Sequence, residues 1–392
     1  MQKNNFTEGA YAMEGHFLVP DYYEDFRCKG GACRRTCCDG WGISVTQEEY
    51  FRLLGLDCPP DLRRRIDVAF HAPETPSPER FRLITPTWQG DCPMRAPDGL
   101  CALQCTCGEE ALPAICRLYP RAPRTAFALE CSCSGSCERV IEMLMAHKEK
   151  MTFHTVPLHF EAELPHGPEL RRPQGYYNAV RQMCLDMLQK RELPLSTRLM
   201  RLCSALRALT PQVSSCPPED GERSIRYFLL SDAPPAAVPE GLDRALSYAR
   251  ALSRELGENS VSLSSYTAAA EQALPDEPAW TAAAQRFANL FPDWETEFEQ
   301  MLVNHLFYDC FPFSDVQENL AQETQSLAAT YALLRFLTVG YAQQHPTRED
   351  YVDAAAAAFR LIEHSRFDHN AAVVLRHAGC ESEAALFGLL QL

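Results

Sequence analysis

The chain has 392 residues, of which 46% are hydrophobic, and a formal net charge of −15. This length suits two or three domains with a sizeable core. An acidic chain repels the phosphate backbone, which argues against nucleic-acid binding and favours basic partners such as a lysine-bearing protein surface, although acidity also serves solubility alone. No stretch reaches roughly 18 consecutive apolar residues, so we expect no membrane span.

Residues 1–150 show little sustained periodicity. The first ten residues lack the basic and apolar segments of a signal peptide, so we expect a cytoplasmic protein. The patterns predict short helices at Thr46–Leu54, Pro60–Ala69 and Glu138–Ala146, and a short strand at Phe81–Ile84. Thr46 followed by Glu49 is typical of a capping box. A region with so little regular pattern is expected to gain its order from a bound metal.

After about residue 170 the apolar residues recur at helical spacing. The predicted helices are Tyr176–Arg191, Ser196–Leu209, Leu242–Leu256, Ser262–Leu274, Ala279–Leu290, Trp294–Phe307, Gln317–Ala342 and Thr347–Arg366. The expected fold is therefore mostly α. An irregular, cysteine-rich metal or cluster domain, residues 1–150, would pack on an α-helical domain, residues 151–392, which is either one unit or two units divided near 210–240.

Thirteen of the 18 cysteines lie between residues 28 and 137. Thiols packed this densely are disulfides, metal ligands or reactive groups. In a cytosolic chain they bind metal more often than they form disulfides, and the adjacent Cys37 and Cys38 cannot easily bridge each other. The other five are scattered, and Cys184 and Cys203 lie on apolar helix faces, as small core residues do.

The clustered cysteines form a series of short motifs with turn residues beside them. These are the C-x4-C-x3-C-C run of Cys28–Cys38, then Gly90–Met94, Gly99–Gln104, Ala114–Arg121 and Leu129–Arg139. This series resembles the cysteine-cluster family described as zinc- or iron-chelating proteins and, more narrowly, its flagellin lysine N-methylase branch. The helical part resembles that branch as well, at Tyr176–Arg181, Arg191–Leu195, Val303–Tyr308, Tyr331–Arg335 and Arg360–Ser365.

The resemblance implies a set of metal ligands. Carried over position by position, these are Cys28, Cys33, Cys37, Cys38, Cys92, Cys101, Cys116 and Cys137. Within the last motif we favour Cys137 because a helix follows it, as in the family. The chain departs from the family pattern in further thiols, which are either incidental or a second site: Cys58, Cys105, Cys107, Cys131 and Cys133.

Two metals fit such a set. Structural zinc typically uses paired knuckles, and the abutting Cys37 and Cys38 are unusual for them. Iron–sulfur clusters take four thiolates from loops of varied spacing, and the resemblance adds weight to a [4Fe–4S] cluster, with zinc as the alternative. Four arginines beside the ligands either offset thiolate charge or are ordinary surface residues: Arg34, Arg35, Arg117 and Arg121.

The resemblance implies methyl transfer from S-adenosylmethionine to lysine side chains of flagellin, a flagellar partner. The lysine must first lose its proton to an acceptor in a partly apolar pocket. The chemically suitable acceptors or wall residues, which are also typical core residues, are Tyr119, Tyr176, Tyr177, His305 and Tyr308. We assign none of them as a catalytic base and assign no donor-binding residues.

No strand-linked G-x-G-x-x-G is present, so a Rossmann-type donor fold is not indicated. Either the helical domain binds the donor and the cluster is structural, or the cluster binds or reduces the donor. Two other classes remain open. One is a non-catalytic zinc- or iron-chelating accessory protein. The other is a redox sensor that uses the surplus thiols Cys105, Cys107, Cys131 or Cys133.

Overall fold

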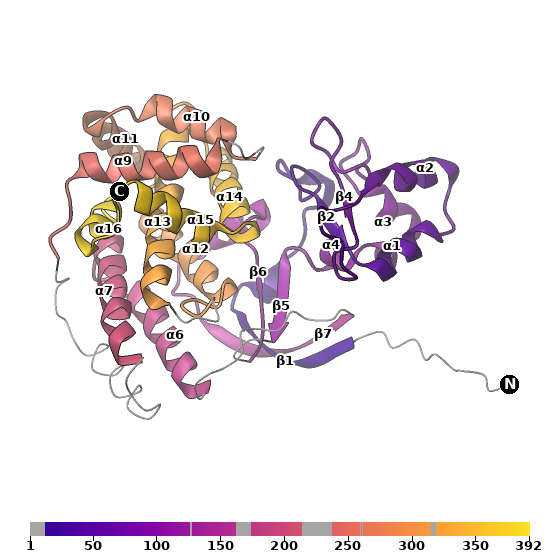
Figure 1. The fold of residues 1–392 in the computed structure, drawn as a ribbon, viewed down its shortest axis with the longest axis horizontal. Coiled ribbons are helices and arrows are strands. Elements are labelled where there is room, and N and C mark those ends of the chain that lie inside the picture. Colours follow the sequence, from indigo (N-terminus) through magenta and orange to yellow (C-terminus); the bar gives the residue numbers. More distant parts are fainter. Residues whose placement is uncertain are drawn as a thin grey trace.

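The computed structural model describes residues 12–125, 128–161, 174–213, 237–258, 260, 262–314 and 319–392. Figure 1 shows a large helical body, a sheet beside it and a smaller lobe on the far side of the sheet. The chain is mostly helical, as the sequence predicts. Two predictions concern segments outside the described residues. These are the lack of a signal peptide in residues 1–10 and, for the most part, the division of the helical domain near 210–240. The domain boundary at residue 150 stays a prediction.

A four-stranded mixed sheet lies in the first part of the chain, in the order β5-β6-β1-β7. Its strands are β1 (Ala12–Pro20), β5 (Arg121–Thr125), β6 (Leu129–Cys133) and β7 (Phe153–Glu161). β1 pairs antiparallel with β7 and parallel with β6, with Phe17 opposite Val156 and Leu18 opposite Glu130. Alternate side chains of β1 and β7 are buried, which is the period of a strand with one covered face.

The smaller lobe has its own apolar core, built on Val45, Leu53 and Ile66. It combines a three-stranded sheet in the order β2-β4-β3 with four short helices. The strands are β2 (Ile43–Val45), β3 (Phe70–His71) and β4 (Arg82–Ile84), and the helices are α1 (Gln47–Leu54), α2 (Pro60–Ala69), α3 (Ala102–Cys107) and α4 (Ala114–Leu118). The predicted capping box is confirmed: Thr46 accepts from Glu49 N, and the Glu49 carboxylate accepts from Thr46 N.

The helical body follows α5 (Glu138–Ala146), which packs against both α12 and α14. Its helices are α6 (Gln174–Leu188), α7 (Leu195–Val213), α9 (Leu242–Leu252), α10 (Ser264–Ala273), α11 (Glu277–Leu290), α12 (Trp294–Tyr308), α13 (Leu320–Tyr341), α14 (Arg348–His364), α15 (Phe367–His377) and α16 (Glu383–Leu389). One continuous apolar core joins these helices to the four-stranded sheet, and α12 lies against β6.

The central helix α13 is buried along most of its length. Its Arg335 guanidinium lies over the ring of Trp294, 3.9 Å from the centroid, so the buried charge has an aromatic partner. Among the described residues we find no helix whose length and apolar content would let it cross a membrane.

The prediction of an irregular N-terminal domain is wrong in one respect, because it missed the four-stranded sheet. β6 contains Cys131 and Cys133, which the motif analysis treated as surplus thiols. β5 contains Pro123, and β7 contains Pro157, residues that weaken a strand pattern. The order of this region therefore comes in part from sheet pairing and from a core shared with the helical body.

Candidate active site and metal centre

The first cysteine run and the second motif lie side by side. The backbone N–H of Cys92 donates to the carbonyl oxygen of Cys38 at 2.7 Å, and Asp39 pairs with Asp91 in an isolated antiparallel bridge. The Cys38 thiol forms hydrogen bonds with the thiols of Cys37 and Cys92, which lower the pKa of Cys38 and raise the pKa of its two partners. Three predicted ligands are thus neighbours.

Two more predicted ligands reach this group from the short helices of the smaller lobe. Cys101 lies at the start of α3, where the backbone N–H of Ala102 donates to the carbonyl oxygen of Met94 at 2.7 Å. Burial raises the pKa of Cys116, in α4, to about 12, and the nearby Cys38 and Cys101 add to that effect. Cys37, Cys38, Cys92, Cys101 and Cys116 form what we call the first thiol group.

A second thiol group contains Cys28, Cys33 and Cys137. Cys137 lies at the start of α5, and burial raises its pKa to about 11, with Cys28 as a further contributor. Burial also raises the pKa of Cys33 to about 12, and the charges of Glu138, Cys137 and Cys28 act in the same direction. Cys37 of the first group has Cys137 among its electrostatic neighbours, so the two groups adjoin.

The donor chemistry of these eight thiols fits a thiolate-bound iron–sulfur or zinc centre. The pKa is raised for six of these thiols, so these six are protonated at neutral pH and metal binding would displace their protons: Cys33, Cys37, Cys92, Cys101, Cys116 and Cys137. In the described part of the chain, no three His, Cys, Asp or Glu side chains lie in positions that would already ligate one ion. The thiols share a neighbourhood, and the ligand set stays a prediction.

Two of the surplus thiols adjoin these groups, since Cys105 is an electrostatic neighbour of Cys101 and Cys133 of Cys137. Cys131 and Cys133 are fully buried in β6, and the Cys131 thiol is 3.2 Å from the Tyr23 hydroxyl. Cys107, at the end of α3, has Cys58 as an electrostatic neighbour. Cys105 is exposed on α3. Cys184 and Cys203 are buried in helix interfaces, which confirms their prediction as small core residues.

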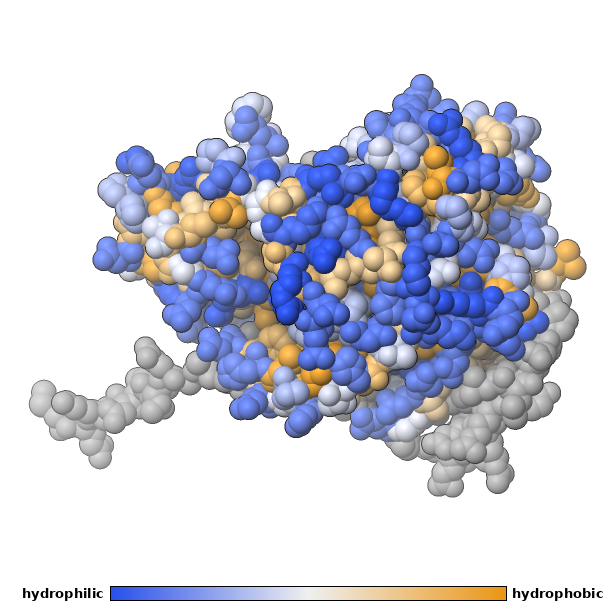
Figure 2. Space-filling view, turned by 180° about the vertical axis from the view of Figure 1, so that it is seen from behind, coloured by the Kyte–Doolittle hydropathy of each residue, from blue (hydrophilic) through white to orange (hydrophobic). Residues whose placement is uncertain are grey.

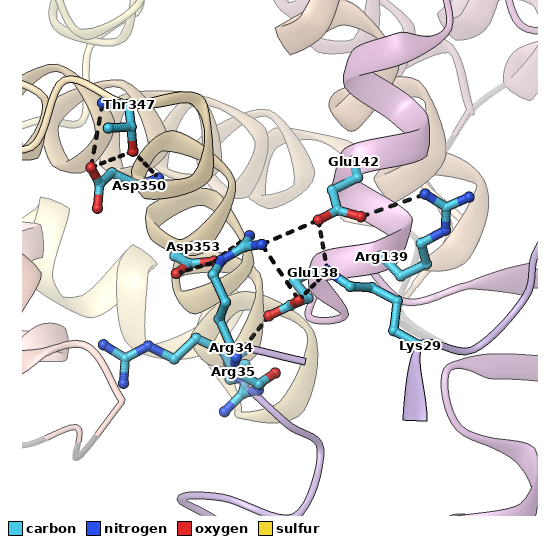
Figure 3. A network of polar contacts seen from close by, with 10 residues as sticks. Lys29, Arg34, Arg35, Glu138, Arg139, Glu142, Thr347, Asp350 and Asp353 are labelled. Carbon is cyan, nitrogen blue, oxygen red and sulfur yellow. Dashed lines mark hydrogen bonds and ion pairs between the residues drawn. The ribbon is translucent and has the colours of Figure 1, made fainter. Parts of the chain in front are cut away.

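Charged residues connect the first cysteine run to two helices of the body (Figure 3). Glu138, whose side chain is fully buried at the start of α5, accepts from Lys29 Nζ at 2.6 Å and from the backbone N–H of Arg35 at 2.7 Å. The Arg34 guanidinium pairs with Asp353 of α14 at 2.8 Å. These bonds position the run between α5 and α14.

The arginines beside the thiols have partners other than the thiols. Arg34 binds carboxylates, and Arg117 donates to the backbone oxygen of Glu161 at 3.2 Å. The Arg121 guanidinium lies 5.0 Å from the ring centroid of Phe26. These contacts favour the interpretation of Arg34, Arg117 and Arg121 as structural residues over a primary role in offsetting thiolate charge.

The turn that contains Cys37 and Cys38 is bound by one buried arginine of α14. The Arg360 guanidinium donates to the carbonyl oxygens of Thr36 at 2.9 Å, Arg35 at 3.0 Å and Asp39 at 3.2 Å. It also lies 5.1 Å from the ring centroid of Trp41. Three carbonyl acceptors within five consecutive residues fix the backbone of this turn.

A polar cluster lies next to the thiol groups, where the turn after β6 meets α14. The Glu363 carboxylate, which is fully buried, accepts from Ser134 Oγ at 2.6 Å and from Gly135 N at 2.9 Å. Glycine is required here because a Cβ at position 135 would lie 2.8 Å from the Phe359 ring. Ser134 Oγ and Ser136 Oγ are 2.6 Å apart.

His364, Tyr119 and Trp41 complete the side of this cluster that faces the thiols. Ser136 Oγ is 2.8 Å from His364 Nε2 and 2.9 Å from the Tyr119 hydroxyl. The Trp41 ring packs edge-on against His364 at 4.8 Å and against Tyr119 at 5.7 Å, and its Nε1 donates to the carbonyl oxygen of Cys37 at 2.8 Å. One indole therefore contacts both the thiol-bearing turn and the polar cluster.

The end of α12 contributes three titratable residues to the same cluster. Burial lowers the pKa of His305, but the hydrogen bond and charge of Glu363 outweigh burial and leave that pKa raised. Burial raises the pKa of Tyr308, and Glu363 adds to this effect. Burial likewise raises the pKa of Asp309. Carboxylates, imidazoles and phenols with shifted pKa values in one cluster are typical of a functional site.

Three of the five side chains proposed from the sequence meet here, namely Tyr119, His305 and Tyr308. Tyr176 and Tyr177 instead lie in the core of α6, where Tyr177 packs on Phe313 at 4.7 Å. Sequence reasoning missed four members of the cluster: Ser134, Ser136, Glu363 and His364. The signal was present, because the motif Arg360–Ser365 contains two of them.

The face of the molecule in Figure 2 is mostly hydrophilic with separate apolar patches. A surface hollow of about 610 Å³ lies elsewhere, between α7, α9 and the C-terminal residues. It is lined by Ser196, Thr197, Met200, Leu242 and Gln391, none of which titrates near neutral pH. The polar cluster is therefore the better candidate for proton chemistry.

Comparison with known proteins places this arrangement in a family. Residues 181–386, which include α14 and its Arg360, Glu363 and His364, match the model of the FliB lysine N-methylase C-terminal domain. The chain belongs to this family, and the resemblance inferred from the motifs is confirmed.

The chain is 30% identical over 152 residues to the lysine-N-methylases of Salmonella choleraesuis (strain SC-B67) and Salmonella typhimurium (strain LT2), covering 36% of this chain and 37% of each relative. It is 26% identical over 149 residues to the flagellar biosynthetic protein FliU of Salmonella muenchen, covering 35% of this chain and 86% of that one. The match thus spans little more than a third of the two lysine-N-methylases. No solved structure matches the chain.

Proposed function

We propose that this protein methylates lysine side chains of flagellin, with S-adenosylmethionine as the methyl donor. The observation that carries the proposal is the family match over residues 181–386, since the matched helix α14 supplies Glu363 and His364 to the polar cluster beside the thiols. The names of the relatives, lysine-N-methylase and a flagellar biosynthetic protein, support the choice of reaction and substrate.

The reaction requires a neutral amine. A lysine ammonium has an ordinary pKa of about 10.4 and no lone pair, so it must lose a proton before it can react. The amine nitrogen then attacks the methyl carbon, and the carbon–sulfur bond breaks with its electron pair staying on sulfur. The products are methyl-lysine and S-adenosylhomocysteine, and the released proton must pass to an acceptor of the protein or to water.

The protein's own groups favour that deprotonation. Arg360 places a positive charge beside Trp41 and His364, and a nearby cation disfavours the charged form of an incoming lysine. The aromatic rings of Trp41 and Tyr119 provide an apolar wall that also disfavours a charge. His364 and the hydroxyl of Ser136 offer hydrogen-bond acceptors at the edge of that wall.

We further propose that the eight predicted thiols hold an iron–sulfur cluster, with zinc as the alternative metal. The residues are Cys28, Cys33, Cys37, Cys38, Cys92, Cys101, Cys116 and Cys137. When bound, the cluster would either order the segment between α5 and α14 or provide a site at which the methyl donor binds or is reduced. The support is the adjacency of the two thiol groups to each other and to Tyr119.

The test combines metal analysis with a methylation assay. The protein is purified without oxygen, its iron, sulfide and zinc are quantified, and it is incubated with flagellin and S-adenosylmethionine. Mass spectrometry of flagellin is expected to show increments of one methyl group on lysines. If the purified protein contains metal but adds no methyl group to flagellin, the result would instead support a non-catalytic chelator.

Cysteine variants test the ligand set. Cys37→Ala is expected to lose metal and activity together. The matched control Cys203→Ala, at a thiol buried between helices and away from both groups, should keep both. Full metal content in the Cys37→Ala protein would contradict the proposed ligands.

A further inference from the structure

Tyr119, Ser136 and His364 form a continuous line of hydrogen-bonding groups. The Tyr119 hydroxyl is 2.9 Å from Ser136 Oγ, and Ser136 Oγ is 2.8 Å from His364 Nε2. Both distances are normal for hydrogen bonds between such atoms. Ser136 is fully buried, so water cannot replace either contact.

The neighbouring residues limit the possible directions of these hydrogen bonds. An ionised Glu363 carboxylate only accepts, so Ser134 donates its single hydroxyl hydrogen to Glu363. Ser134 Oγ is then an acceptor and cannot supply a hydrogen to Ser136 or to His364. The single hydrogen of Ser136 can point to Ser134 Oγ at 2.6 Å or to His364 Nε2 at 2.8 Å, and Tyr119 can donate to Ser136 in either case. The line to His364 is complete when the Ser136 hydroxyl is rotated toward Nε2.

The protonation state of His364 is compatible with this direction. Burial lowers the pKa of His364, the charge of Arg360 lowers it further, and the charge of Glu363 opposes both. The net effect keeps the imidazole neutral at neutral pH. A neutral ring with its hydrogen on Nδ1 presents a bare Nε2 to Ser136.

The two ends of the line lie in different surroundings. Tyr119 has Cys137 and Cys37 among its electrostatic neighbours, one from each thiol group. The Nε2 atom of His364 lies against the fully buried Ser136, while the residue as a whole, at the end of α14, is exposed to solvent. The line therefore leads from the thiol-lined region to solvent.

We propose that Tyr119, Ser136 and His364 are a proton relay that removes the proton of the substrate lysine from the thiol-lined site and delivers it to solvent. The inference rests on the proposed methyl transfer and assigns residues to its proton step. Ser134 and Glu363 are positioning residues, because they hold the turn that contains Ser136.

One proton enters the relay at Tyr119, and one proton leaves it at His364. The lysine ammonium gives one proton to the Tyr119 oxygen as Tyr119 passes its own hydrogen to Ser136, and Ser136 passes its own to His364 Nε2. The imidazolium releases the Nδ1 proton to water, and tautomer exchange through water restores the starting state. Burial raises the pKa of Tyr119 well above its ordinary value, so the two transfers at its oxygen occur together and no phenolate accumulates.

The test compares His364→Gln with the matched control His369→Gln. His369 is an exposed histidine on the next helix, α15, five residues further along the chain. His364→Gln keeps the size and polarity of the side chain but cannot take up a proton. We expect kcat for flagellin methylation to fall by about 100-fold with KM changed by less than about threefold, while the control keeps wild-type values.

Three further measurements separate a relay from a structural role. Ser136→Ala and Tyr119→Phe should lower kcat to a similar extent, because each breaks the same line. Since His364 is exposed, imidazole can enter the space left in His364→Ala. Added imidazole should raise the kcat of His364→Ala by about tenfold or more and leave the kcat of Ser136→Ala unchanged. Metal content and melting temperature should match wild type in His364→Gln and in His364→Ala.

The outcomes distinguish the inference from the proposed function. If the wild-type protein methylates flagellin and His364→Gln retains its kcat, the relay is wrong and the proposed function stands. If His364→Ala is inactive but imidazole does not restore activity, the relay is also wrong. If the metal-loaded wild-type protein transfers no methyl group, the proposed function fails and the relay fails with it.

Discussion

Glu363 accepts a hydrogen bond from Ser134 across 229 residues of sequence, with 2.6 Å between the carboxylate and the hydroxyl oxygen. This bond joins the last turn of α14 to the turn that follows β6. Gly135 N donates to the same oxygen, and His305 lies 3.3 Å from the other. A fully buried carboxylate thus organises a helix end, a turn and a second helix.

Removal of this carboxylate should destabilise the protein. Glu363→Ala leaves Gly135 N, Ser134 Oγ and His305 without their acceptor in a buried site, which is expected to cost about 3 kcal/mol. Urea unfolding measures the change. Glu381→Ala, at an exposed glutamate near α16, is the control and should change stability by less than about 0.5 kcal/mol. Equal stability of the two variants would show that the Glu363 bonds contribute nothing net.

The pair of His305 and Glu363 predicts a pH dependence of stability. The folded-state pKa of His305 is raised, so the pair stabilises the fold fully below the ordinary histidine pKa and loses that contribution as pH rises through the raised value. We expect the wild-type protein to have a larger free energy of unfolding than Glu363→Gln at low pH. This difference should decrease by about 1 kcal/mol between about pH 6 and pH 9. Urea unfolding at both pH values tests this. A constant or growing difference would contradict the predicted charge on His305.

The start of α14 should depend on its cap. The Thr347 hydroxyl accepts from Asp350 N at 3.1 Å, and the Asp350 carboxylate accepts from the Thr347 backbone N–H (Figure 3). Thr347→Ala should cost about 1 kcal/mol in urea unfolding. Thr281→Ala, which removes an exposed threonine inside α11, is the matched control. The prediction fails if both substitutions have the same effect.

The first cysteine run should become more reactive when its anchor on α5 is removed. Glu138→Gln weakens the contacts with Lys29 and the backbone of Arg35. Without metal, Cys28 and Cys33 should then react with a thiol reagent several times faster than in wild type, as followed by peptide mass spectrometry. Glu142→Gln, at a more exposed partner of Lys29, should have a smaller effect. Unchanged labelling rates would mean that Glu138 does not hold the run.

The sequence predicts the helices and misses the sheet, for physical reasons. α2 and α5 begin and end at the predicted residues, and Thr46 caps α1 as expected, because helical spacing and caps are local signals. The strands β1 and β6 pair across more than 100 residues of sequence. No local pattern encodes such a pairing.

The candidate site, too, could be predicted from the sequence only in part. The spacing of the cysteines indicates a thiol-rich site, and the structure brings Cys38 and Cys92 into contact. Glu363 and His364 lie on a helix predicted from its apolar face, and nothing in that pattern marks them as partners of Ser134 and Ser136. Their role follows from the packing of α14 on the turn after β6. Such a contact between distant segments cannot be predicted from a single sequence.

The bond between Arg360 and Thr36 has a consequence for biosynthesis. The two residues are 324 positions apart. At roughly 5–20 residues per second, the ribosome needs on the order of 15–65 s to add the intervening chain. During that interval the nascent Cys37 and Cys38 lack the guanidinium that later braces their turn. The proposed metal centre would therefore be inserted only after the whole chain has been synthesised, and before then the Cys37 and Cys38 thiols would be open to oxidation or to binding of other metal ions.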